Sequence, residues 1–121
     1  MTTITFRKNP DDEIVEFTAD GHTNYGVEGE DIVCAAVSSI VQTAALGILM
    51  KAHVEAKITR NDKKGYFKLE LPACLTSPER HNCNMILDTM ALGLADLSEN
   101  YSDFVVIARN EAIPNDPPKS E

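Results

Sequence analysis

A histidine and a cysteine near the N-terminus have the types and spacing of a catalytic pair. His22 follows Gly21, and Cys34 stands where a long apolar segment begins, in the stretch GHTNYGVEGEDIVC. A cysteine attacks as its thiolate, and a free cysteine has a pKa of about 8.5. The partial positive charge at a helix start and a nearby imidazolium would both favour the thiolate. The pair therefore predicts an activated nucleophile, Cys34, with His22 as its base.

Each of the two residues also has an ordinary structural interpretation. Cysteine is among the most buried residue types, so Cys34 could be a core residue, and a histidine after glycine could be a turn residue. Gly26 and Gly29 permit sharp reversals of the chain, so residues 23–30 could loop back and bring His22 to Cys34. That loop would overhang the pair and could act as a mobile lid.

Asp31 and Ser38 lie about one helical turn before and after Cys34, on the same helix face. Asp31 could cap the helix or orient His22, and a carboxylate aimed at the sulfur would oppose thiolate formation. Ser38 could donate to a substrate or bond back to the helix. The other cysteines, Cys74 and Cys83, lack metal-type spacing, so we expect a structural role for Cys74, a core position for Cys83, and no metal or cofactor.

Hydrophobic periodicity predicts five strands and two helices. In chain order these are strands over 3–7 and 14–19, a helix over 32–50, strands over 54–60 and 66–71, a helix with Ser77 as its N-cap, and a strand over 104–108. The order β-β-α-β-β-α-β predicts a two-layer α+β domain, with both helices on one face of a mixed sheet. We expect one domain over residues 1–113 and a flexible, proline-rich C-terminal tail over 114–121.

Two details of these elements can be tested against a structure. In the second strand, Val15, Phe17 and Ala19 should share one face. The helix over 32–50 has an apolar stripe but is apolar on most of its other sides too, so it needs a second cover besides the sheet, either another helix or another subunit. The stripe comprises Val33, Val37, Ile40, Val41, Ala44 and Ile48.

The overall composition restricts the class of partner. The 121 residues carry 19 acidic and 11 basic side chains, for a net charge of −8. This balance argues against direct binding of nucleic acid and suits a basic partner. The first residues lack the apolar core of a signal peptide, and no apolar run of spanning length lacks polar interruption, so no membrane role is expected. The odd cysteine count is typical of a reducing cytoplasm.

The residues from Gly21 to Ser38 resemble the signature of a known family. A glycine–histidine pair, an acidic and glycine-containing loop, and the segment GEDIVCAAVS stand in the order and spacing of the ribosomal-processing cysteine protease Prp family. The length and element order also agree over nearly the whole chain. The resemblance implies that His22 and Cys34 are the catalytic residues, and that Gly21, Asp31 and Ser38 belong to the same motif.

The resemblance further implies a substrate and an assembly state. Members of the family remove an N-terminal extension from a large-subunit ribosomal protein, cutting between an aromatic-containing hydrophobic segment and a basic body. They form homodimers, use no metal or cofactor, and have a mobile loop after the histidine. Glu28, Glu30 and the proline-rich tail are local features that leave the specificity of the loop open.

Two other functions remain open from the residues alone. A non-catalytic domain could bind or help assemble a ribosomal protein, with Cys34 buried in the core. A redox sensor could use Cys34 reversibly, but it would need a resolving thiol, and neither Cys74 nor Cys83 has an evident reason to lie nearby. Reactivity toward an alkylating agent below pH 8 would separate an activated thiol from a buried one.

Overall fold

The computed structural model describes residues 1–21, 30–108 and 111–112, and describes only the backbone of residues 30, 31, 111 and 112. In chain order the elements are β1 (Thr2–Lys8), β2 (Ile14–Gly21), α1 (Glu30–Met50), β3 (Lys57–Asn61), β4 (Tyr66–Glu70), α2 (Ser77–Asn100), β5 (Val105–Ile107) and β6 (Glu111–Ala112). The predicted order β-β-α-β-β-α-β is confirmed, with the two-residue strand β6 added after it. The predicted tail, 114–121, lies outside the described residues.

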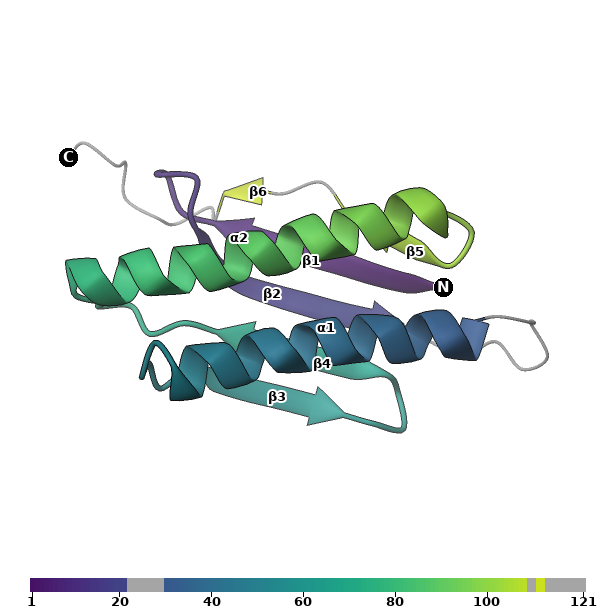
Figure 1. The fold of residues 1–121 in the computed structure, drawn as a ribbon, viewed down its shortest axis with the longest axis horizontal. Coiled ribbons are helices and arrows are strands. Elements are labelled where there is room, and N and C mark those ends of the chain that lie inside the picture. Colours follow the sequence, from purple (N-terminus) through teal and green to yellow (C-terminus); the bar gives the residue numbers. More distant parts are fainter. Residues whose placement is uncertain (22–29, 109–110, 113–121) are drawn as a thin grey trace.

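The sheet is mixed, with the strand order β3-β4-β2-β1-β5 and with β6 paired to β1. β1 pairs with β2 in the antiparallel direction and with β5 in the parallel direction, so the first strand of the chain lies inside the sheet. The two helices lie side by side over one face of the sheet and run in opposite directions (Figure 1). Their N-terminal ends therefore lie at opposite ends of the sheet.

The core lies between the helices and this sheet face. Phe17, Leu69 and Ile48 are fully buried there, and the Phe17 and Phe67 rings stack with centroids 6.0 Å apart. The predicted stripe of α1 is buried as expected, except that Ile40 is only partly buried against α2 near Gly93. The predicted second cover of α1 is thus provided in part by α2.

Two local predictions were wrong. Val15 does not share the buried face of β2, because the β1–β2 register shifts after Arg7 and Lys8 pairs with Ile14, which is buried instead. Such a bulge adds one residue to one strand, so the side chains beyond it point to the opposite face from the one that an unbroken alternation predicts.

Helix α2 is capped by Thr76 rather than Ser77. The Thr76 hydroxyl accepts from the Glu79 N–H, and the Glu79 carboxylate accepts from the Thr76 N–H, which completes a capping box.

Helix α1 also corrects the expectation about apolar length. Its residues Ile32–Met50 are long and apolar enough to cross a membrane, judged by length and composition alone. The apolar stripe of this helix packs on the sheet and α2, whereas Ile32, Leu46 and Met50 are exposed, so packing within the chain accounts for only part of its apolar composition.

Candidate active site

The candidate site lies where three chain segments meet below the first turns of α1. Thr2 begins β1, Gly21 ends β2, and Gly65 closes the turn between β3 and β4. Thr2 is the register partner of Gly21, and the Gly21 N–H donates to the Gly65 carbonyl at 3.0 Å. The small side chains at this end of the sheet leave space between the sheet and α1.

Close backbone approach explains why glycine occupies both positions. Gly65 has a φ of +66°, and a Cβ added to it would clash with the Gly21 carbonyl oxygen. A Cβ on Gly21 would clash with the Thr2 side chain and lie 3.0 Å from the Thr2 Cα. A larger residue at either position would therefore push apart the strand ends that form the floor of the site.

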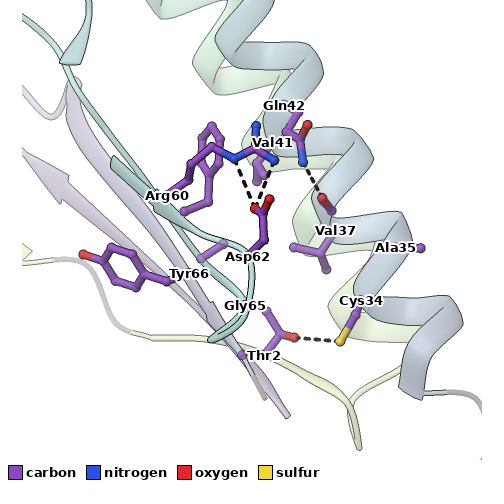
Figure 2. A pocket seen from close by; sticks show the side chains of 14 residues that line it. Thr2, Cys34, Ala35, Val37, Val41, Gln42, Arg60, Asp62, Gly65 and Tyr66 are labelled. Atoms are coloured by element: carbon purple, nitrogen blue, oxygen red, sulfur yellow. Dashed lines mark hydrogen bonds and ion pairs between the residues drawn. The ribbon is translucent and has the colours of Figure 1, made fainter. Parts of the chain in front are cut away.

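Cys34 faces this floor from α1. Its side chain is half-buried, and its Sγ lies 3.5 Å from the Thr2 Oγ1 (Figure 2). The Thr2 residue is only 4% exposed. The Cys34 thiol is thus partly accessible, in contrast to a fully enclosed core cysteine.

A cavity of about 360 Å³ extends from Cys34 along α1. On the helix side, the Gln42 Nε2 donates to the Ser38 Oγ at 2.6 Å. On the sheet side, the Arg60 Nε and Nη2 donate to the Asp62 carboxylate at 3.1 and 3.0 Å. Figure 2 shows Gln42 across the cavity from Arg60 and Asp62, further along α1 than Cys34. The cavity therefore offers both apolar surface and hydrogen-bonding groups to a bound chain.

The structure brings three of the predicted site residues together. Gly21, Cys34 and Ser38 all line this cavity. His22 lies outside the described residues, as does most of the predicted lid, 23–30. Helix α1 begins at Glu30, so Asp31 belongs to its first turn rather than preceding it, and its side chain is not described.

The other two cysteines are clearly different from Cys34. Cys83 is fully buried in α2, as predicted, and burial raises the pKa of its thiol, with a smaller contribution from Glu79 and an opposing one from Arg80. Cys74 is exposed after β4, so it does not pack into the core. Within the described parts of the chain, no group of three or more histidine, cysteine and acidic side chains could hold a metal ion.

Sequence reasoning missed several cavity residues. Thr2 follows the same alternation as Ile4 and Phe6, which place it on the helix-facing side of β1, but the predicted strand began one residue later. Gln42 lies one helical turn after Ser38 on the same face of α1, which was a usable signal. Arg60 and Asp62 come from an exposed hairpin, where charged residues are ordinary, so no pattern distinguishes them from other surface residues.

Comparison with known proteins places the chain in a family. The profile of the family described as "Cysteine protease Prp" matches residues 1–106. The ribosomal processing cysteine protease Prp of Bacillus subtilis is 28% identical over 91% of this chain and 98% of its own length. The protein of the same name from Staphylococcus aureus is 25% identical over 85% of this chain and 93% of its own length.

Solved structures share the fold. A protein from Streptococcus mutans superposes with a TM-score of 0.81 at 24% identity, covering 93% of this chain and 96% of that one. The S. aureus ribosomal processing protease Prp in complex with a substrate peptide superposes with a TM-score of 0.77 at 23% identity, covering 93% of this chain and all of that one. With a family profile that matches most of its length, the chain belongs to the Prp family of cysteine proteases.

Proposed function

We propose that this protease removes an N-terminal extension from a large-subunit ribosomal protein, with Cys34 as nucleophile and His22 as acid and base. The observation that carries the proposal is the position of the Cys34 sulfur, which is half-buried at one end of a cavity large enough for part of a peptide. The names of the B. subtilis and S. aureus relatives support a ribosomal substrate.

The mechanism uses two steps that both pass through Cys34. His22 takes the thiol proton, the sulfur attacks the scissile carbonyl, and His22 then gives the proton to the departing amine. Water, deprotonated by His22, next attacks the thioester and releases the acid product and the free thiol. The N–H groups of the first turn of α1, which lack partners within the helix, are the proposed donors to the oxyanion.

The charge of the protein suits the proposed substrate. A net charge of −8 attracts the basic body of a ribosomal protein and raises its rate of encounter. Salt at about 0.15 M shortens the range of such attraction to about 8 Å, so the association rate should fall as salt is added. A cleavage rate at limiting substrate that is independent of salt would contradict this steering.

The direct test compares cleavage by matched cysteine variants. A peptide spanning a candidate ribosomal extension is incubated with the wild-type protein, with Cys34→Ala and with Cys74→Ala, and the products are identified by mass spectrometry. We expect cleavage by the wild type and by Cys74→Ala, because Cys74 is exposed and does not line the cavity. Cleavage by Cys34→Ala at the wild-type rate would place the nucleophile elsewhere.

The non-catalytic alternative makes a different prediction for the same thiol. A ribosomal-protein binding or assembly domain does not need a reactive cysteine, so Cys34 would alkylate only at the pH expected for an ordinary thiol. Rapid alkylation below pH 8, with protection by the peptide, supports the protease. Peptide binding without cleavage or enhanced alkylation would support the binding domain.

We also propose that the protein is a cytoplasmic homodimer. All three cysteines are free, which suits a reducing compartment. The outer face of the helices carries a groove of about 610 Å³ lined in part by Thr43, Met85 and Thr89. Leu46, Met50 and Leu92 are exposed on the same helices, and Leu92 is 73% exposed.

A twofold interface uses the same surface on both copies, so one apolar face is sufficient to make it. Sedimentation analysis of the wild type should give twice the chain mass, and Leu92→Lys should give the monomer. Asp103→Lys, at an exposed position in the turn between α2 and β5 and outside the helical face, is the control. A wild-type protein that sediments as a monomer at all concentrations would contradict the dimer.

A further inference from the structure

We propose that Thr2 is a positioning residue for the nucleophile, and that its hydroxyl donates a hydrogen bond to the Cys34 thiolate. The distance from Thr2 Oγ1 to Cys34 Sγ is 3.5 Å, and while the thiol is protonated either atom can be the donor. Once the thiol loses its proton, sulfur can only accept, so the hydroxyl becomes the donor. This inference rests on the proposed role of Cys34.

The backbone holds Thr2 firmly in place. Its N–H donates to the Phe104 carbonyl at 2.7 Å, and its register partners are Gly21 on β2 and Val105 on β5. Neighbouring strands on both sides and 4% exposure leave the side chain little freedom. A hydroxyl fixed in this way can direct its proton to sulfur without ordering a mobile side chain first.

The contact favours the charged form of the nucleophile. A hydrogen bond to the ionised form of a group stabilises that form, and it is stronger where water is excluded. Unlike an imidazolium, a threonine hydroxyl keeps its proton at every pH of interest. Its contribution therefore persists above the pH at which His22 would lose its charge.

Charged groups elsewhere around the cavity do not replace this contact. Arg60, Asp62 and Tyr66 line the cavity from the β3–β4 hairpin, and Arg60 and Asp62 bond to each other. Among the described side chains, β1 and β2 add no charged group to the cavity lining. Because these groups are the same in the parent and in the Thr2 variants, their effect on the Cys34 alkylation profile cancels when the variants are compared.

The test measures the alkylation of Cys34 against pH, without substrate. A Cys74→Ser parent leaves Cys34 as the accessible thiol in the described parts of the chain, since Cys83 is fully buried. Iodoacetamide rates are followed by mass for the parent, Thr2→Val and Thr2→Ser. Valine keeps the branched shape without the hydroxyl, and serine keeps the hydroxyl.

We expect Thr2→Val to raise the midpoint of the alkylation profile by about one pH unit, which lowers the rate near pH 7 by up to about tenfold. The plateau at high pH should stay at the parent level, and Thr2→Ser should keep the parent midpoint. A change of shape or access alone would instead scale the rate equally at all pH values.

Two outcomes overturn different claims. An unchanged midpoint in Thr2→Val, with a parent that reacts below pH 8, removes the role of Thr2 and leaves the proposed protease intact. A parent that is itself unreactive below pH 8 overturns the activated Cys34 and this inference with it. If Thr2→Val does not fold, Thr2→Ser against Thr2→Ala isolates the hydroxyl in the same way, and equal midpoints in that pair also overturn the proposal.

Discussion

The N-terminal ends of the two helices lie at opposite ends of one sheet face (Figure 1). Each helix carries a cysteine within its first two turns. Cys34 on α1 is half-buried beside a cavity, whereas Cys83 on α2 is fully enclosed. The end of α2 is closed by a polar cluster. The Arg80 Nη2 donates to the Ile14 carbonyl at 2.7 Å, and the Asn84 Nδ2 donates to the Glu13 carboxylate at 2.9 Å.

The difference between the two ends shows that the surroundings, more than the helix start, decide what a cysteine can do. Neither cysteine lies in the first turn of its helix, since Cys34 is the fifth residue of α1 and Cys83 the seventh of α2, so the partial positive charge of the helix start acts only weakly on both. Cys83 has a raised pKa because burial removes water from the charged form. Cys34 instead faces a buried hydroxyl and a cavity, beside strand ends whose close approach requires glycine at positions 21 and 65.

The first prediction concerns Gly65, at the end of the sheet near Cys34. Gly65→Ala should lower the free energy of unfolding by about 2–4 kcal/mol, because alanine strains at a φ of +66° and its Cβ meets the Gly21 carbonyl. Urea denaturation measures the change, and peptide cleavage should fall with it. Lys64→Ala in the same turn is the control, with an expected change within about 0.5 kcal/mol. Equal stability of the two variants would show that the strand ends tolerate a side chain there.

Replacing sulfur with oxygen tests the two cysteines, Cys34 on α1 and Cys83 on α2, separately. Cys83→Ser should cost about 1–3 kcal/mol of stability, because its hydroxyl is buried among apolar groups, yet the folded variant should cleave normally. Cys34→Ser should cost much less stability and lower kcat by at least about a thousandfold. Loss of activity in folded Cys83→Ser would show that Cys83 influences the site at Cys34, and would contradict our view that the two cysteines act independently.

The raised pKa of Cys83 also gives the stability a dependence on pH. The unfolded thiol ionises near pH 8.5, while the buried thiol stays neutral to higher pH, so above pH 8.5 the unfolded state binds fewer protons. Stability from this group is complete below that pH and is lost as the pH rises toward the folded pKa, by up to about 1.4 kcal/mol per pH unit. Denaturation of the wild type and of Cys83→Ala between pH 7 and 10 should show a shallower fall in the variant. Parallel curves would mean that Cys83 does not cause the fall.

The cap of α2 tests whether the N-terminal ends of the two helices influence each other. Thr76→Ala removes a capping hydroxyl from α2 and should cost about 1 kcal/mol, without changing the alkylation of Cys34. Glu79→Gln, which keeps an oxygen to accept from the Thr76 N–H, should be nearly as stable as the wild type. A changed Cys34 alkylation rate in Thr76→Ala would show that the two helix starts communicate.

Periodicity predicted the elements well, and it failed where a local feature interrupts the period. The stripe of α1 was recognisable because its spacing follows the helix repeat without interruption. The bulge after Arg7 moved Ile14 into the core and Val15 out of it, and pairing across two strands determines such a shift. The short strand β6 was not predicted either, since two residues are too few to show a periodicity.

The motif that resembles the family signature was visible because its residues are close in the chain, whereas the other residues of the cavity were not predicted. Gly21, Cys34 and Ser38 fall within one short stretch. Thr2 and the Arg60–Asp62 pair reach the cavity only through the sheet register, which places the ends of β1, β2 and the β3–β4 hairpin side by side. A single sequence contains no direct signal for that register.

The parallel pairing of β1 with β5 determines when the sheet below Cys34 can form during synthesis. Thr2 meets Val105 across the sheet, so two segments from nearly opposite ends of the chain must join before the floor below Cys34 is complete. Contacts between such distant segments form late and slow the folding of a domain. Domains also emerge from the ribosome with their N-terminal part first, so β1 must wait for β5 to leave the exit tunnel. A nascent chain therefore cannot complete the sheet below Cys34 until β5 has left the exit tunnel.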